Sequence, residues 1–233
     1  MSEVVEITER ALEEVAVFPL SGAVLLPRTL ISLHVFEPRY RAMTQYCLDG
    51  SRLMVVAMTR PESPPDAFGR PAVHKVAGLG ILRQSARLPD GRYNIVIEGL
   101  CRVNISDEHD PGPSFRRVRA RILEDQMPAD SRSLLPAMAS LRSLCTRAMV
   151  HVSPSDASEL QGLNEVDEPG PLADLVAAAA LTDPSERQDV LAEPDVEARL
   201  GLVAGSLGAF LLVQQSDAEE DSPIGWGITP GKA

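Results

Sequence analysis

The stretch Leu30–Met43 reads L-I-S-L-H-V-F-E-P-R-Y-R-A-M and joins two kinds of local structure. Thr29–Phe36 alternates enough to predict a strand. Pro38 fits the first position of a helix, where its missing N–H costs nothing. The residues that follow at spacings of three and four share one helical face: Tyr40, Met43 and Cys47. The join therefore predicts a strand that leads directly into a helix over Pro38–Asp49.

Other strand-length runs lie on both sides of this join. They cover Val15–Leu20, Leu53–Met58, Val76–Leu88, Arg92–Ile97, Cys101–Ser106 and Phe115–Leu123. Pro89-Asp90-Gly91 between two of these runs is a hairpin turn signal, and Gly99 predicts a bulge between two others. Six or so strands with one helix predict a compact, largely antiparallel β-barrel.

The pattern changes at Pro128, after which apolar residues recur with helical spacing. Helices are expected over Ser133–Val150, Ser155–Leu163, Pro171–Leu181 and Asp195–Gln215, with a further helix that Asp183 caps. We expect one face of the third helix to be buried, through Leu172, Leu175 and Val176. The predicted class is α+β, with an acidic arm at residues 1–14, a barrel at 15–127 and a helical part at 128–215. Residues 216–233 are acidic and then rich in glycine and proline, so we expect a disordered tail.

The formal charge of −11 is unevenly spread. Residues 15–122 hold 15 Lys or Arg against 9 Asp or Glu, whereas residues 123–233 hold 6 against 19. This asymmetry favours two physically distinct parts, a basic barrel and an acidic helical part. The alternative is a solvated surface that has no charged partner.

A search for catalytic and metal-binding motifs is negative. The chain has no G-x-x-x-x-G-K-[ST] phosphate loop, no G-x-S-x-G and no H-E-x-x-H. Its three cysteines are far apart and lie within apolar runs, which favours buried free thiols in a reducing compartment. There is no secretory signal pattern, and the apolar stretches are too short or too interrupted by glycine to span a bilayer. We expect a cytoplasmic, non-enzymatic protein without cofactor, metal or membrane contact.

Five pieces of the chain, in order, resemble the N-terminal substrate-binding domain of Lon proteases. They are Val17-Phe18-Pro19-Leu20, Leu26-Pro27, Leu33–Arg41, Gly78-Leu79-Gly80 with Leu88–Val103, and Pro169–Leu175. The likeness is closest to stand-alone bacterial proteins built from that domain. The resemblance implies a PUA-like β-barrel followed by an α-helical bundle, and a role in recognising proteins.

Lon proteases continue into an ATPase module and a Ser–Lys peptidase, whereas this chain ends at Ala233. We therefore expect the binding function to carry over and the catalytic activity not to. The resemblance implies unfolded or degron-bearing polypeptides as partners, a protease as a further candidate partner, and an adaptor or chaperone-like role. RNA binding is the alternative, because PUA-like barrels in other families bind RNA and one strand carries Arg116, Arg117, Arg119 and Arg121. A hydrolase with a cryptic site is a third interpretation.

Four residues are candidates for contact with a bound peptide: Phe36, Arg39, Tyr40 and Phe68. The first three lie at the join of strand and helix, and exposed aromatic and arginine side chains are good anchors in protein recognition. Phe68 is the large apolar residue of a long Pro-rich loop, Thr59–Ala72. The structural alternatives are that Phe36 and Tyr40 pack the helix onto the barrel and that the loop is an inert connection. The junction of basic barrel and acidic bundle is a further place for an extended peptide.

Overall fold

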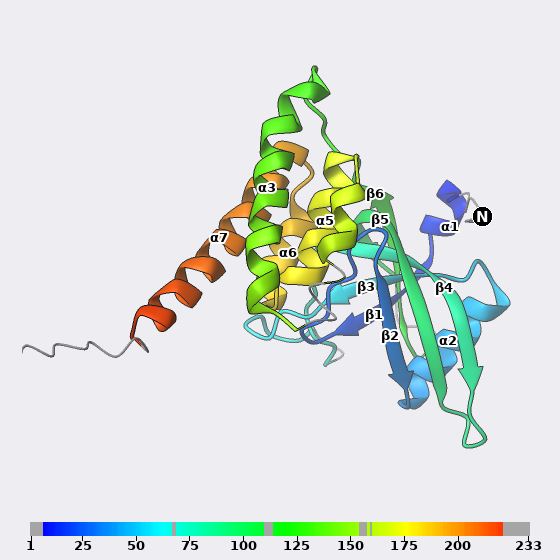
Figure 1. The fold of residues 1–233 in the computed structure, drawn as a ribbon. Coiled ribbons are helices and arrows are strands. Elements are labelled where there is room, and N and C mark those ends of the chain that lie inside the picture. Colours follow the sequence, from blue (N-terminus) through cyan, green and yellow to red (C-terminus); the bar gives the residue numbers. More distant parts are fainter. Residues whose placement is uncertain (1–6, 67–68, 110–113, 154–157, 159, 221–233) are drawn as a thin grey trace, which may run out of the picture.

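The computed structural model describes residues 7–66, 69–109, 114–153, 158 and 160–220. Figure 1 shows a β-barrel with one helix packed on it and a group of helices beside it. This mixture of a six-stranded sheet and helices confirms the predicted α+β class. The candidate Phe68 and much of the expected helix over Ser155–Leu163 lie outside the described residues.

The strands form one sheet in the order β2-β5-β4-β3-β1-β6. They cover β1 Val15–Leu20, β2 Leu30–Val35, β3 Leu53–Met58, β4 Val76–Arg87, β5 Tyr93–Glu108 and β6 Arg116–Ile122. The first half of β5 pairs with β2, and its second half pairs with β6, which closes the barrel. Among the described strands β2 pairs only with β5, so it forms an edge beside the closed barrel.

One strand pair departs from the expected antiparallel barrel, because β1 and β3 run parallel. Parallel neighbours need a crossover connection, and the chain supplies it with β2 and helix α2, Pro38–Asp49. On its other side β1 pairs with β6 only over Val15–Val17. Pro19 lies beyond that ladder, where a missing N–H breaks no bond between strands.

Apolar side chains fill the barrel and also the space between the sheet and α2. The barrel interior is packed with small and branched residues, among them Val17, Val55, Leu79, Ile105 and Val118. The second core lies under α2, and the helical face expected from the sequence is buried there: Tyr40, Met43 and Cys47. The strand-to-helix join therefore forms as predicted because its apolar stripe covers the sheet.

The loop between β1 and β2 connects the barrel to the helices. Leu25 packs under α2, whereas its neighbour Leu26 packs into the helical part. A Cβ atom at Gly78 would collide with the backbone of Leu25, and one at Gly99 with that of Leu26. Glycine at these two positions therefore lets the loop lie directly on the sheet. β5 runs through Gly99 without ending, and a register shift against β4 marks the expected bulge there.

The second half of the chain forms a helical bundle, on the left in Figure 1. Its main helices are α3 Leu135–Ala148, α5 Pro169–Ala180, α6 Pro184–Ala192 and α7 Val196–Glu220. Asp183 caps α6 as expected, since its side chain accepts from the Ser185 N–H at 2.8 Å. The buried face of α5 includes Leu172 and Val176 but leaves Leu175 half-buried, which corrects the expected set of three.

Helix α7 reaches Glu220, past the expected end at Gln215, and projects from the bundle in Figure 1. Over Val196–Gln215 it is long and apolar enough to cross a membrane, by length and composition alone. Core helices of soluble proteins share this character, and Leu200, Val203 and Leu207 are buried in the bundle. The helix is therefore weak evidence for a membrane span, and the absence of membrane contact stays a prediction.

Candidate functional site

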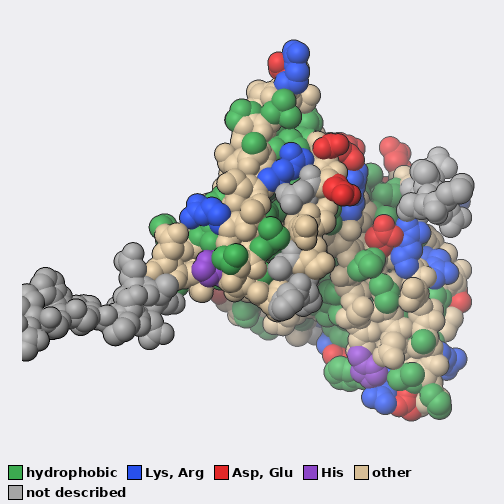
Figure 2. All heavy atoms as spheres, viewed as in Figure 1, with side chains coloured by type: hydrophobic (Ala, Val, Ile, Leu, Met, Phe, Trp, Pro, Cys, Tyr) green, Lys and Arg blue, Asp and Glu red, His purple; other side chains and the backbone are tan. Residues whose placement is uncertain are grey.

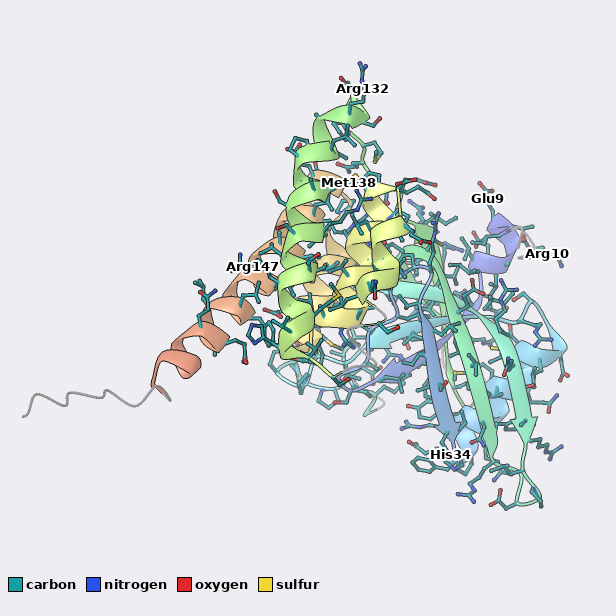
Figure 3. The ribbon with its side chains drawn as sticks, in the orientation of Figure 1. Glu9, Arg10, His34, Arg132, Met138 and Arg147 are labelled. Carbon is teal, nitrogen blue, oxygen red and sulfur yellow. The ribbon has the colours of Figure 1, made fainter. Side chains whose placement is uncertain are left out.

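The join of β2 and α2 places Phe36 at the surface, where 61% of the residue is exposed. The centre of its ring lies 6.4 Å from that of His34. Since the two residues are two positions apart at the end of a strand, both side chains leave the sheet on the same face. Figure 3 shows His34 at the lower end of β2. Phe36 is therefore available to a partner.

At the start of α2, the guanidinium of Arg39 lies over the ring of its neighbour Tyr40. The Nε atom of Arg39 donates to Glu37 Oε2 at 2.8 Å, and its guanidinium lies 4.5 Å from the centre of the Tyr40 ring. Tyr40 itself is 9% exposed and packs on Phe18, with 4.5 Å between ring centres. Burial raises the pKa of its phenol, against the lowering effect of Arg39. The position of Tyr40 matches the packing alternative, whereas Arg39 remains at the surface.

The C-terminal end of the Thr59–Ala72 loop is fixed to the barrel wall by arginines. Arg116 Nη1 on β6 donates to the Pro71 carbonyl at 2.6 Å, and Arg70 pairs with Glu108 at 2.7 Å. The end of the loop therefore lies against β5 and β6.

The outer face of β2, β5 and β4 forms an open groove of about 460 Å³. Its lining mixes polar side chains with apolar ones and includes Ser32, Leu33, His34, Gln84, Asn94 and Ile95. His34 Nδ1 lies 2.7 Å from Asn94 Oδ1, and Arg92 Nη1 lies 3.0 Å from His34 Nε2. These contacts fit a neutral imidazole that donates through Nδ1 and accepts through Nε2. Figure 2 shows hydrophobic side chains on both sides of His34.

Buried ion pairs fill the junction between barrel and bundle. Arg102 of β5 is 3% exposed, and its guanidinium forms two hydrogen bonds with Asp174 of α5. Arg199 of α7 is fully buried and binds both carboxylate oxygens of Asp125, at 2.9 and 2.6 Å. Burial opposes the ionisation of Asp125, but the hydrogen bond and charge of Arg199, with Arg102, hold its pKa below the usual value. The charge complementarity expected to hold a peptide here instead joins the two parts of the molecule.

A cavity of about 290 Å³ remains beside these ion pairs. Its rim carries the Arg28–Glu168 pair, with oxygen–nitrogen distances of 3.0 and 2.9 Å. This volume is at the lower end for a small-molecule pocket. Sequence reasoning missed the ion pairs because Arg102 and Asp174 are 72 residues apart and no local pattern connects them.

Three of the four arginines on β6 have acidic partners. Arg116 pairs with Glu108 at 2.7 Å, Arg119 pairs with Glu13 at 2.7 Å, and Arg117 pairs with Glu14. Glu13 and Glu14 directly follow the short helix α1, Glu9–Leu12, so the end of the acidic arm lies along β6. Its carboxylates neutralise positive charge that a phosphate backbone would need.

The described residues show neither a metal centre nor an activated thiol. No group of three or more His, Cys, Asp or Glu side chains in that part of the chain could hold a metal ion. The three cysteines are unpaired. Burial raises the pKa of the Cys47 thiol to about 12 and those of Cys101 and Cys145 to about 11. The nucleophilic thiolate is therefore scarce at neutral pH.

Comparison with known proteins identifies the family. The sequence model of one protein family, the ATP-dependent protease La (LON) substrate-binding domain, matches residues 14–207, which is most of the chain. The chain belongs to the LON substrate-binding domain family. The resemblance seen in the sequence is thereby confirmed.

Curated relatives of this LON-domain chain are much longer than it is. The Lon protease of Desulfosudis oleivorans is 24% identical over 222 residues, which cover 92% of this chain and 27% of that protein. Lon protease 1 of Herpetosiphon aurantiacus is 29% identical over 206 residues, covering 86% of this chain and 24% of that protein. The Lon protease of Escherichia coli is 28% identical over 189 residues, covering 80% and 24%. The chain thus spans about a quarter of the length of these relatives.

Two solved structures share the fold of this LON-domain chain. The N-terminal domain of Mycobacterium avium complex Lon protease has a TM-score of 0.66 at 17% identity, and covers 84% of this chain and 98% of that one. The Lon N-terminal domain protein from Xanthomonas campestris has a TM-score of 0.58 at 17% identity, covering 82% and 97%. Both therefore share the fold over more than four fifths of this chain.

Proposed function

We propose that this chain is a non-catalytic module that binds unfolded or degron-bearing polypeptides, as an adaptor or chaperone-like protein that serves a protease. The observation that carries the proposal is the match of residues 14–207 to a domain that binds the substrates of a protease. Further support comes from exposed apolar side chains at the end of β2. The raised pKa values of buried Cys47 and Cys145 and of half-buried Cys101 fit a chain without a nucleophilic thiol. The free thiols also fit a reducing, cytoplasmic setting.

The binding function is tested with one protein in two states. Reduced, carboxymethylated α-lactalbumin stays unfolded, and native α-lactalbumin has the same sequence in a folded form. The immobilised chain is expected to retain the unfolded form and to release the native form, because only the former exposes extended apolar segments. Equal retention of both forms, or of neither, would contradict the proposal.

The non-catalytic part of the proposal has its own test. The purified chain should hydrolyse neither ATP nor unfolded casein above a buffer control. Turnover that follows the protein through several chromatographic steps would show that the chain is an enzyme.

RNA binding through β6 is the alternative, and the pairing of Arg116, Arg117 and Arg119 with carboxylates argues against it. Capture of crosslinked partners from native lysate, with and without nuclease, separates the two functions. Polypeptides retained after nuclease treatment support the first proposal. Retention that nuclease abolishes supports RNA.

A further inference from the structure

The free side of β2 carries backbone hydrogen-bonding groups that no described strand uses. The Thr29 carbonyl accepts from the Gly99 N–H at 2.9 Å, so Thr29 faces β5. Backbone groups alternate in direction along an antiparallel strand. The residues whose N–H and C=O groups point away from the sheet are therefore Leu30, Ser32 and His34. In Figure 1 β2 is accordingly the outer margin of the sheet, on the side of β5 away from β4.

This edge lacks the usual protection against strand pairing. Natural edge strands carry charged residues or proline, or are covered by another segment. The segment Leu30–Phe36 has no charged residue and no proline. Leu30 and Phe36 are 67% and 61% exposed on one face, and Ile31 and Leu33 are half-buried on the other. The edge is thus open in its backbone, with exposed apolar side chains at both ends of one face and half-buried apolar side chains on the other.

We propose that β2 takes up an extended, uncharged polypeptide segment as an additional strand of the sheet. This inference rests on the proposed function and names its site and mode. Outward N–H and C=O groups at alternating residues are matched by another extended backbone, which gives affinity without a fixed sequence. Side chains of the added strand alternate between the face of Leu30 and Phe36 and the face of Ile31 and Leu33. Unfolded proteins expose such segments and folded proteins bury them.

A single strand fits the available space. An added strand needs only about 4.8 Å beside β2. The helical bundle rises on this side of the barrel in Figure 1, and the Arg28–Glu168 pair joins it to the chain just before β2. If β2 paired with β2 of a second copy, the barrel of that copy would have to fit next to the helical bundle of the first. We therefore assign the edge to an extended segment, and the test below distinguishes it from self-pairing.

Two substitutions of the same residue isolate the backbone contribution. Ser32→Pro removes an N–H that points away from β5, so the β2–β5 ladder keeps its bonds. Ser32→Ala keeps that N–H and removes only the hydroxyl. With a short peptide of alternating valine and threonine as the probe, Ser32→Pro is expected to bind about tenfold more weakly, whereas Ser32→Ala binds as the unaltered chain does. Melting temperatures of both variants report whether the fold is retained.

Modified peptides test the same point without changing the protein. N-methylation of every second residue blocks one edge of the peptide and leaves the other edge able to pair, whereas N-methylation of every residue blocks both edges. The fully methylated peptide is expected to lose about tenfold in affinity, and the half-methylated peptide to bind nearly as the parent does. Equal binding of the fully methylated and half-methylated peptides, or of Ser32→Pro and Ser32→Ala, would overturn strand addition and leave the proposed function intact.

Two further outcomes would also overturn the inference. If the unaltered chain binds neither the peptide nor unfolded α-lactalbumin, the proposed function fails together with it. If size-exclusion chromatography shows a dimer that Ser32→Pro dissociates while peptide affinity is unchanged, the edge pairs two copies of this chain.

Discussion

Phe36 lies just before α2 and Tyr40 lies in its first turn, and the surroundings of the two side chains are opposite. Phe36 is 61% exposed beside His34, whereas Tyr40 is 9% exposed against Phe18. Phe36→Ala should therefore change the free energy of unfolding by no more than about 0.5 kcal/mol while it weakens capture of unfolded α-lactalbumin. Tyr40→Ala should cost about 3–5 kcal/mol, because it empties a core site. Urea unfolding checks both values, and a large loss of stability in Phe36→Ala would show that this ring packs the fold.

The three thiols provide a second prediction at the residue scale. With pKa values of about 12 for Cys47 and about 11 for Cys101 and Cys145, almost no thiolate exists at pH 8. Iodoacetamide should therefore label the folded protein very slowly at pH 8. The rate should rise as pH approaches 11, and it should rise at pH 8 when urea unfolds the chain and the thiols regain ordinary pKa values. Fast labelling of the folded chain at pH 8, located by mass spectrometry, would contradict this assignment.

Among the elements, α5 shows which side chains hold the bundle together. Leu172 is 1% exposed within the bundle core, whereas Leu175 is half-buried on the same helix. Leu172→Ala should cost about 2–5 kcal/mol of unfolding free energy, and Leu175→Ala should cost clearly less. The two variants remove the same atoms from the same helix, so a difference in melting temperature reports burial alone. Equal losses would mean that both side chains reach the core.

The elements also show which features of the fold the sequence could predict. β1, β3 and α2 have the predicted bounds, because continuous apolar runs and the Pro38 helix start are local signals. The parallel pairing of β1 with β3 was not foreseen, since local pattern does not state which strands become neighbours. The open edge of β2 was missed for the same reason. At the candidate site, the sequence left open whether Phe36 packs the helix onto the barrel or faces solvent, and the structure exposes it. The buried partners of Arg102 and Arg199 depend on contacts between distant segments, which no local pattern predicts.

For the whole molecule, the junction decides whether barrel and bundle unfold together. Removing one partner of a buried pair leaves an uncompensated charge and costs about 3–5 kcal/mol. Arg102→Met should therefore lower the urea midpoint strongly, and Arg102→Met with Asp174→Leu should recover part of the loss. Arg132 and Asp130 also form a pair, at 3.0 Å, but on the exposed tip of the bundle labelled in Figure 3. Arg132→Met is the matched control and should leave the midpoint unchanged.

If Arg132→Met lowers the urea midpoint as much as Arg102→Met does, buried and exposed ion pairs contribute equally to stability. Two separate transitions in the unaltered chain would show that the junction does not couple barrel to bundle. A single transition is expected, because the same ion pairs contact β5, α5 and α7.

The position of Arg199 also determines how the start of α7 is attached to the rest of the molecule. α7 starts beside this residue and extends outward past the bundle. Arg199 binds Asp125, which follows β6, and lies 3.5 Å from Asp174 on α5. Because Arg199 lies in the first turn of α7, a displacement of this end of the helix would disturb its ion pairs with Asp125 and with Asp174 at the same time. The start of α7 is therefore held by both the segment that follows the barrel and the bundle.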